Sequence, residues 1–271
     1  MGAPEHDRCI EFVRGHRCQD VLPLLPAACF DACISDPPYG IGIADWDSDV
    51  PSTETWAEVL RVMKPGAWLV AFGARRTFHR LATRVEEAGF KIVDMGAWVY
   101  ANGRPPSKLH LKPAHEPILI ARAPGKPLRL DIESCRVPWR DELDRKSACR
   151  VNTLRANTTK RRAYRSSMAA YGRDAFVTKD GGRWPSTIMA TDDDLLGDGS
   201  HVFAVPKVRD AGAHVCSKPQ ALLEHLVKLF VPVGGVVLDP FAGGGGVGTI
   251  ATRLGRRAVL VDGASSEAPV G

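Results

Sequence analysis

The fold is decided by residues 236–249, which read Val-Val-Leu-Asp-Pro-Phe-Ala-Gly-Gly-Gly-Gly-Val-Gly-Thr. Val236 to Asp239 form an apolar run that a proline stops, so the pattern predicts a short buried strand. The four glycines that follow predict a loop that accepts positive φ and lets a ligand approach the backbone closely. A helix is predicted from about Val247 to Leu254. This order of strand, glycine loop and helix is typical of nucleotide-binding α/β folds, and alone it does not say which nucleotide.

An acidic residue ends the next apolar run. Ala258 to Val261 predict a last short strand, and Asp262 follows about twenty residues after the glycine loop, where an acid can accept hydrogen bonds from ribose hydroxyls. The loop lacks the Gly-Lys-Ser/Thr ending of a phosphate loop, which disfavours ATP hydrolysis.

The rest of the chain alternates short apolar runs with helical patterns. The predicted strands are residues 30–35, 67–72 and 91–99, and the predicted helices are residues 55–63, 78–88 and 217–230. Strands separated by helices of this length imply a mainly parallel, doubly wound sheet covered on both faces. The predicted fold class is therefore α/β.

Composition narrows the class of protein. The chain has 271 residues, of which 44% are apolar and 25% charged, and its mean hydropathy is −0.13. This is enough for a substantial core, whereas no window approaches the roughly 18 apolar residues of a membrane span. The amino terminus lacks the pattern of a secretory signal, so we expect a cytoplasmic protein without a membrane partner.

The seven cysteines are an odd number, and none form a Cys-x-x-Cys pair, which indicates reduced thiols and no metal site. Cys29 and Cys33 are four residues apart. A metal site could use this spacing, but small buried thiols explain it more simply.

Positive charge is concentrated in one segment. The net charge is +5, yet residues 129–183 hold fourteen Lys or Arg against seven Asp or Glu, so the remainder sums to about −2. No acidic residue occurs between Asp144 and Asp174. The segment is either a solvated positive face or a surface that binds a polyanion.

A second motif lies at the end of the predicted strand 30–35. It reads Asp36-Pro37-Pro38-Tyr39-Gly40. The two prolines fix the backbone and have no N–H, so they present carbonyl oxygens in a rigid array. With an acid before them and an aromatic after them, the site can accept hydrogen bonds from a planar amine and stack on its ring, as a flipped nucleobase requires. The alternative is a plain turn.

These two motifs together resemble those of amino DNA methyltransferases that use S-adenosylmethionine, specifically the permuted beta group. In that group an Asp-Pro-Pro-Tyr motif comes first, target recognition lies in the middle, and an Asp-Pro-Phe-x-Gly motif comes last. The resemblance implies a Rossmann-like methyltransferase fold with this division: residues 8–123 as the catalytic half, 124–205 as the target recognition region, 206–262 as the cofactor-binding half, and 263–271 as a tail.

The resemblance also implies roles for residues. Asp36 and the Pro37 carbonyl would accept hydrogen bonds from the target amine, Pro38 completes the motif, and Tyr39 would stack on the extruded base. Lys218 would lie near the methionine end of S-adenosylmethionine. The other cofactor-binding residues implied are Asp36, Asp239, Pro240, Phe241, Ala242, Gly243 and Asp262. The DNA-binding candidates in the basic segment are Arg150, Arg155, Lys160, Arg161, Arg162, Arg165 and Arg173. Trp46 and Asp47 fall in a loop that can close over the base, although packing explains Trp46 equally well.

The family pattern is not matched everywhere. Family members usually read Gly-Ser-Gly-Thr after the first cofactor motif, whereas residues 243–249 of this chain read Gly-Gly-Gly-Gly-Val-Gly-Thr. A Gly-Asp pair of the family is replaced by His16 and Arg17, and the carboxyl-terminal region is short. The predicted activity is methyl transfer to adenine N6 in duplex DNA, because an Asp before the prolines is associated in the resembling family more with adenine than with cytosine.

Four alternatives remain open. They are a cytosine-N4 enzyme, an RNA methyltransferase, a methyltransferase for a protein glutamine amide, and a non-catalytic DNA-binding subunit with a degenerate cofactor site. We expect a homodimer, and the predicted enzyme needs no metal.

Overall fold

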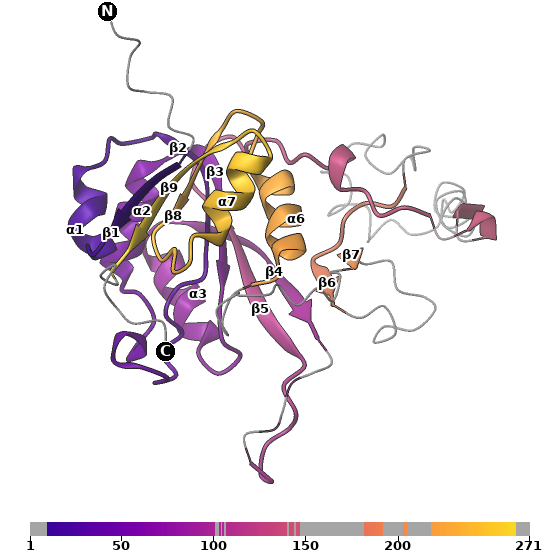
Figure 1. Ribbon diagram of the computed structural model, residues 1–271, viewed down its shortest axis with the longest axis horizontal. Helices are drawn as coiled ribbons and strands as arrows, with labels where there is room; N and C mark the ends of the chain where they lie inside the picture. The colour runs from indigo at the N-terminus through magenta and orange to yellow at the C-terminus, as the bar shows by residue number, and fades with distance from the viewer. Residues whose placement is uncertain are drawn as a thin grey trace, which may run out of the picture. The chain divides into compact units, whose positions relative to one another are not determined.

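The computed structural model describes residues 10–100, 103, 105, 107–139, 141–143, 145–146, 182–191, 203–204 and 218–263. The chain divides into two compact units, the first formed by Met1–Asp131 with Ser186–Gly271 and the second by Ile132–Pro185. Figure 1 shows that the first unit holds the sheet and its covering helices.

In the described residues, nine strands form one sheet in the order β1-β9-β8-β2-β3-β5-β4-β6-β7. Every neighbouring pair is parallel except those that involve β5, which runs antiparallel to both β3 and β4. The strands are β1 (Ile10–Arg14), β2 (Phe30–Ser35), β3 (Met63–Phe72), β4 (Lys91–Val99), β5 (His115–Arg122), β6 (Ile188–Ala190), β7 (Phe203–Ala204), β8 (Val236–Asp239) and β9 (Arg257–Asp262). The predicted α/β class and mainly parallel sheet are confirmed.

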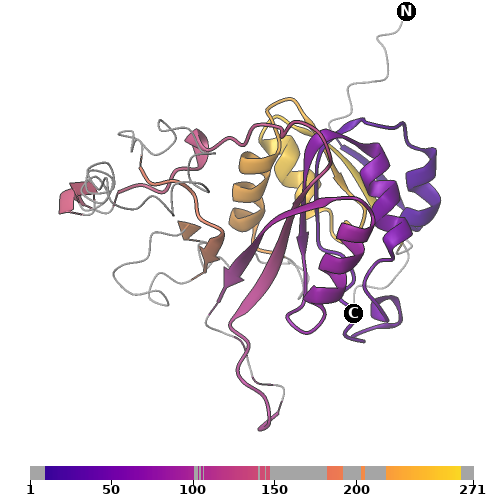
Figure 2. The ribbon, with the colours of Figure 1, turned by 180° about the vertical axis from the view of Figure 1, so that it is seen from behind.

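Helices cover both faces of this sheet, as the two opposite views show (Figures 1 and 2). One face carries α1, α2 and α3, and the other carries α6 and α7. The helices are α1 (Cys18–Val21), α2 (Thr53–Val62), α3 (Phe78–Glu87), α6 (Gln220–Phe230) and α7 (Gly246–Arg253). The sheet is therefore doubly wound, as its sequence predicts.

The helix α2 shows how sequence sets this arrangement. Ser52 caps the helix, because its hydroxyl accepts a hydrogen bond from the Thr55 amide at 3.3 Å. Trp56, Val59 and Val62 then recur at helical spacing, and all three side chains are fully buried against the sheet. On the opposite face, Trp68 of β3 packs edge-to-face on Phe230 of α6.

The bounds of β3 and the number of strands depart from the sequence prediction. The sequence predicts a helix over 55–63 and a strand over 67–72, with Lys64, Pro65 and Gly66 between them, but β3 already starts at Met63. The pairing of β2 with β3 shifts register between Phe30 and Ala32, and this irregularity accommodates the proline and glycine. The strands β1, β6 and β7 were not predicted. β6 and β7 have only three and two residues, which are too few to show a period.

The second unit is described by residues 132–139, 141–143, 145–146 and 182–185. Val137 and Arg183 form an antiparallel bridge there, and the Arg136 guanidinium is paired with Glu133 at 2.9 Å. All seven predicted DNA-binding residues, from Arg150 to Arg173, lie outside the described residues.

Two features are absent from the described residues. No described helix is long and apolar enough to cross a membrane. No group of three or more His, Cys, Asp or Glu among the described residues has a geometry that could hold a metal ion.

Candidate active site

The two motifs meet because their strands are neighbours. β2 and β8 are parallel, with Cys33 opposite Leu238, so both strands end at the same edge of the sheet. The Ser35 hydroxyl donates a hydrogen bond of 2.5 Å to the Asp239 carboxylate across this edge. This hydrogen bond joins residues that are 204 positions apart in the sequence. The segments that follow β2 and β8 therefore start next to each other.

Asp239 supports the glycine-rich turn from inside. Its side chain is buried, and it accepts hydrogen bonds from Ser35 and from the Phe241 amide at 3.2 Å. Burial raises the pKa of Asp239 to about 7, the two hydrogen bonds oppose this rise, and the charges of Asp36 and Asp262 add to it. Asp239 therefore fixes the path of the loop, and Pro240 and Ala242 beside it are also buried.

The glycine loop itself is open to a ligand. A side chain added at Gly243 or Gly244 would meet nothing within 4 Å, and both residues are exposed. Gly245 instead adopts φ 78° and lies against Phe12, a combination that favours glycine. Phe241 packs its ring edge-to-face on Trp56 at 6.2 Å, toward the core. This backbone surface, with Asp262 at the end of β9, fits a nucleoside with ribose hydroxyls.

Beside this loop, Asp36 belongs to a cluster of four polar side chains. The Tyr39 hydroxyl lies 2.6 Å from Asp36 Oδ1 and 3.2 Å from Glu116 Oε2. The Lys218 ammonium lies 2.5 Å from Asp36 Oδ2 and 3.3 Å from Glu116 Oε2. Side-chain exposure is 9% for Lys218, 23% for Glu116 and 35% for Asp36, so the cluster opens to solvent at Asp36.

Topology explains how Glu116 and Lys218 reach this edge. Because β5 is antiparallel to β3, it begins where β3 ends, and the Gly73 amide donates to the Pro117 carbonyl at 3.0 Å. Glu116 is the second residue of β5 and therefore lies at the same edge as Asp36. Lys218 stands two residues before α6, the helix that leads into β8.

The two carboxylates control the protonation of their neighbours. Burial raises the pKa of Tyr39 far above its ordinary value, and the negative charges of Asp36 and Glu116 raise it further, so the hydroxyl keeps its proton. Burial lowers the pKa of Lys218, but the attraction of both carboxylates outweighs burial and the net pKa is raised. With both carboxylates ionised, the cluster holds one positive and two negative charges.

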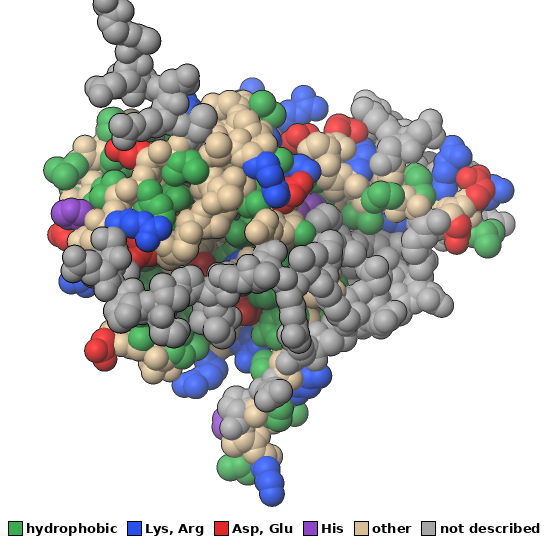
Figure 3. Space-filling model, in the orientation of Figure 1, with side chains coloured by type: hydrophobic (Ala, Val, Ile, Leu, Met, Phe, Trp, Pro, Cys, Tyr) green, Lys and Arg blue, Asp and Glu red, His purple; other side chains and the backbone are tan. Residues whose placement is uncertain are grey.

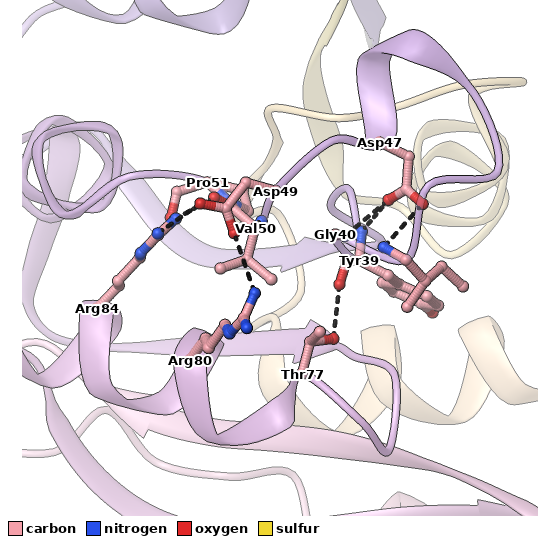
Figure 4. A network of polar contacts seen from close by, with 10 residues as sticks. Tyr39, Gly40, Asp47, Asp49, Val50, Pro51, Thr77, Arg80 and Arg84 are labelled. Atoms are coloured by element: carbon pink, nitrogen blue, oxygen red, sulfur yellow. Dashed lines mark hydrogen bonds and ion pairs between the residues drawn. The ribbon is translucent and has the colours of Figure 1, made fainter.

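The loop after the motif is held firmly at both ends, as Figure 4 shows. The buried carboxylate of Asp47 accepts hydrogen bonds from the amides of Tyr39, Gly40, Ile41 and Ile43, at 2.5 to 3.2 Å. The Thr77 hydroxyl donates to the Tyr39 carbonyl at 2.6 Å.

A second anchor holds the far end of the loop. Arg84 of α3 pairs with Asp49 at 2.6 Å and also donates to the Val50 carbonyl. The backbone at Tyr39 is therefore preorganised before any substrate binds.

A family comparison agrees with this geometry. The family model described as DNA methylase, of the N6 and N4 type, matches residues 30–268. The chain belongs to this family. The match includes both the Asp36–Tyr39 motif and the glycine loop.

Several bacterial members of the DNA methylase family are similar to this one. The type II methyltransferase M2.LlaDCHI of Lactococcus lactis subsp. cremoris is 22% identical over 255 residues, which cover 86% of this chain and 77% of that protein. M.HpaI of Haemophilus parainfluenzae is 24% identical over 242 residues, covering 86% of this chain but 63% of that protein, which is less than two thirds. M2.DpnII of Streptococcus pneumoniae is 44% identical over only 52 residues, 19% of each chain.

Solved structures share the fold of this DNA methylase. A structure titled as the complex of M1.HpyAVI with SAM has a TM-score of 0.55 and 17% identity, and 95% of each chain is covered. The PvuII DNA methyltransferase, titled as cytosine-N4-specific, has a TM-score of 0.57 and 12% identity over 96% of this chain and 85% of that one.

For this family member, the predicted site residues are brought together unevenly. Asp36 contacts both Tyr39 and Lys218 directly. Pro37 and Pro38 lie between Asp36 and Tyr39 in the sequence. Asp239, Pro240, Phe241 and Ala242 are mostly turned into the protein, whereas Gly243 is exposed. Trp46 is 66% exposed, which disagrees with a packing role.

Sequence reasoning missed Glu116 as a member of the site and did not assign Thr77 or the anchoring role of Asp47. The one local signal for Glu116 is its place just before the apolar run Ile118 to Ala121.

Proposed function

We propose that this chain is a DNA methyltransferase that transfers a methyl group from S-adenosylmethionine to an exocyclic amine, adenine N6, in duplex DNA. The observation that carries this proposal is the Asp36 carboxylate, which opens to solvent, follows β2 directly and precedes two prolines that have no N–H to donate. Family membership and the SAM complex of a protein with the same fold support the choice of reaction and cofactor.

The residues of the chain account for the steps of such a reaction. Asp36 and the Pro37 carbonyl accept hydrogen bonds from the amine and direct its lone pair toward the methyl group. Tyr39 supports Asp36 through its hydroxyl and offers its ring for stacking on the flipped base. S-Adenosylmethionine, when bound, would supply an electrophilic methyl group on a sulfonium: the N–C bond forms as the S–C bond breaks, the thioether leaves as a neutral group, and the methylated amine releases one proton to solvent. Gly243 and Gly244, after β8, and Asp262, at the end of β9, would hold its nucleoside half.

Cytosine N4 is the second candidate for the methylated atom. The PvuII methyltransferase, which has the same fold, is titled as cytosine-N4-specific, and both amines fit an acid and a carbonyl as acceptors. We prefer adenine because an Asp before the two prolines, here Asp36, is associated in the resembling family more with adenine than with cytosine. The order of the two motifs, 36–39 before 239–243, supports placement in the permuted beta group.

The test is a tritiated methyl-transfer assay on duplex DNA, followed by mass spectrometry of the nucleosides. We expect N6-methyladenine from the wild type and no transfer from Asp36→Ala, with DNA affinity nearly unchanged. Asp94→Ala, at an exposed carboxylate in β4, is the matched control and should retain activity. DNA binding by the wild type without any methyl incorporation would refute the proposal that the protein is an enzyme. N4-methylcytosine as the product would show that the target base is cytosine and not adenine. A loss of DNA binding in Asp36→Ala as large as its loss of methyl transfer would refute the role assigned to Asp36.

A further inference from the structure

The connection between β4 and β5 carries a second cluster of candidate contacts. We propose that residues 107–113 of this connection bind duplex DNA next to the active site, with Lys108 and Lys112 on phosphates and Leu109 and Leu111 in a groove. This inference rests on the proposed function, since it names another surface that serves the same substrate. It differs from the basic segment 129–183, which the sequence favours for DNA binding.

The connection starts from the edge of the sheet that holds the active site. β4 ends there at Val99, and β5 begins there at His115, one residue before Glu116. The Tyr100 amide donates to the Ala114 carbonyl at 2.9 Å, which continues the pairing of the two strands outward. Both ribbon views show the connection projecting away from the end of β4 and β5 (Figures 1 and 2).

The tip of the connection has a defined local structure. The Ser107 hydroxyl accepts a hydrogen bond from the Leu109 amide at 3.1 Å and lies 2.8 Å from His110 Nδ1. The His110 amide closes the turn on the Ser107 carbonyl at 3.1 Å. Gly103 lies so close to the Pro113 carbonyl that a side chain at Gly103 would collide with it, so the two arms of the connection touch. A turn ordered in this way can present its side chains to a partner with little entropic cost.

The side chains on this turn suit a nucleic acid. Leu109 and Leu111 are each 94% exposed, and Lys108 and Lys112 flank them and make no ion pair within the described residues. The space-filling view shows basic and hydrophobic side chains together at the tip of this projection (Figure 3). Between Tyr100 and His115 the sequence has three basic residues and no Asp or Glu.

Charge distinguishes DNA from other partners for this surface. Phosphates attract lysines without any sequence requirement, and apolar side chains between them can lie against base edges and sugars. A second copy of the chain would bring two groups of lysines together, and like charges oppose such contact. Duplex DNA held at the Asp36 edge would lie within reach of this projection.

The test uses salt dependence, because it needs no knowledge of the recognition sequence. Binding of the full-length protein to a short random-sequence duplex is measured at several salt concentrations, for the wild type and for a Lys108→Ala, Lys112→Ala variant. Loss of two phosphate contacts should reduce the slope of log K against log salt by about 1.8. A Leu109→Ala, Leu111→Ala variant should keep the slope but lower methyl transfer on duplex DNA by about tenfold.

The matched control is Lys91→Ala with Lys126→Ala, two exposed lysines at the opposite edge of the sheet, where β3 and β4 begin. Their slope should equal that of the wild type. An unchanged slope in the Lys108 and Lys112 variant overturns the proposal, and so does an equal change in the control. A shift in sedimentation mass with an unchanged slope would instead assign the surface to a second copy. If the wild type binds DNA but transfers no methyl group, the proposed function fails while the slopes still test this surface.

Discussion

The balance of charge around Asp36 leads to a prediction about Glu116. One ammonium, that of Lys218, contacts two carboxylates, at 2.5 Å from Asp36 and 3.3 Å from Glu116. In Glu116→Gln the new side chain has nearly the same shape and can still accept a hydrogen bond from Tyr39, but its charge is lost. Lys218 is then neutralised by Asp36 alone. Asp36 becomes a weaker acceptor for the amine, and the site loses the net negative charge that suits a sulfonium.

The size of the effect follows from the geometry. Unit charges 3.3 Å apart interact by about 1.3 kcal/mol in water and by about 5 kcal/mol at an effective dielectric constant near 20. Because Asp36 is partly open to solvent, a value near the lower limit, about 1.5 to 2 kcal/mol, is appropriate. This corresponds to a fall in kcat of about 10- to 30-fold. KM for DNA should change little, because Glu116 is only 23% exposed and contacts Tyr39 and Lys218 within the protein.

A double-mutant cycle separates this role from a structural one. Lys218→Met in the Glu116→Gln background removes the unbalanced ammonium and restores a single negative charge at Asp36. At saturating S-adenosylmethionine, kcat of the double variant should therefore exceed that of Glu116→Gln. Calorimetry without DNA gives a second test, in which the affinities for S-adenosylmethionine and for neutral S-adenosylhomocysteine are compared. Glu116→Gln should weaken the binding of S-adenosylmethionine, which carries the sulfonium charge, and leave the binding of S-adenosylhomocysteine unchanged. The reasoning would be refuted if the two substitutions lowered kcat additively in the double variant, or if Glu116→Gln weakened the binding of both ligands equally.

Two further predictions concern groups that hold the site in place. Because the folded-state pKa of Asp239 is raised to about 7, the folded protein binds a proton more tightly than the unfolded chain, and stability falls as pH rises from about 4 to about 7. Urea unfolding should show this fall, up to about 4 kcal/mol, and Asp239→Asn should flatten it; a wild-type curve without the fall contradicts the assignment. Asp47→Ala removes the acceptor of four backbone amides and should cost about 2 to 4 kcal/mol in thermal unfolding together with most methyl transfer, whereas an unchanged melting temperature would mean that the loop is held elsewhere.

Local sequence signals predicted the parts of the fold whose causes are local. Three predicted strands have the bounds that the structure gives them: 30–35 is β2, 91–99 is β4 and 236–239 is β8. Each is a short run that neighbouring residues delimit, so its bounds can be predicted without knowledge of the rest of the chain. The helix bounds agree within a few residues for the same reason. β6 and β7 are too short to show a period, and they join the sheet only through pairing with β4 and with each other.

The active site was only half predictable, and Glu116 shows why. Asp36 and Tyr39 share one motif, so their chemistry is visible in the sequence. Glu116 reaches Tyr39 only because β5 runs antiparallel between β3 and β4, and the sequence does not reveal which strand is reversed. Once that reversal is known, a residue at the start of β5 must lie where the parallel strands end, and the only question left is its chemistry.

Asp47 illustrates a different limit. The resemblance places it in a loop that can close over the base, but its carboxylate is fully buried and accepts four amide hydrogen bonds. From the sequence, an acidic residue in a polar loop is predicted to be exposed, because no local pattern indicates that backbone amides will surround its carboxylate. The consequence is functional: with the Tyr39 backbone fixed by Asp47 and Thr77, and its hydroxyl by Asp36 and Glu116, substrate binding need not order the aromatic ring. The side chains of this loop that remain exposed are Ile43 and Trp46, so a role in contacting a substrate is one that they, and not Asp47, are free to take.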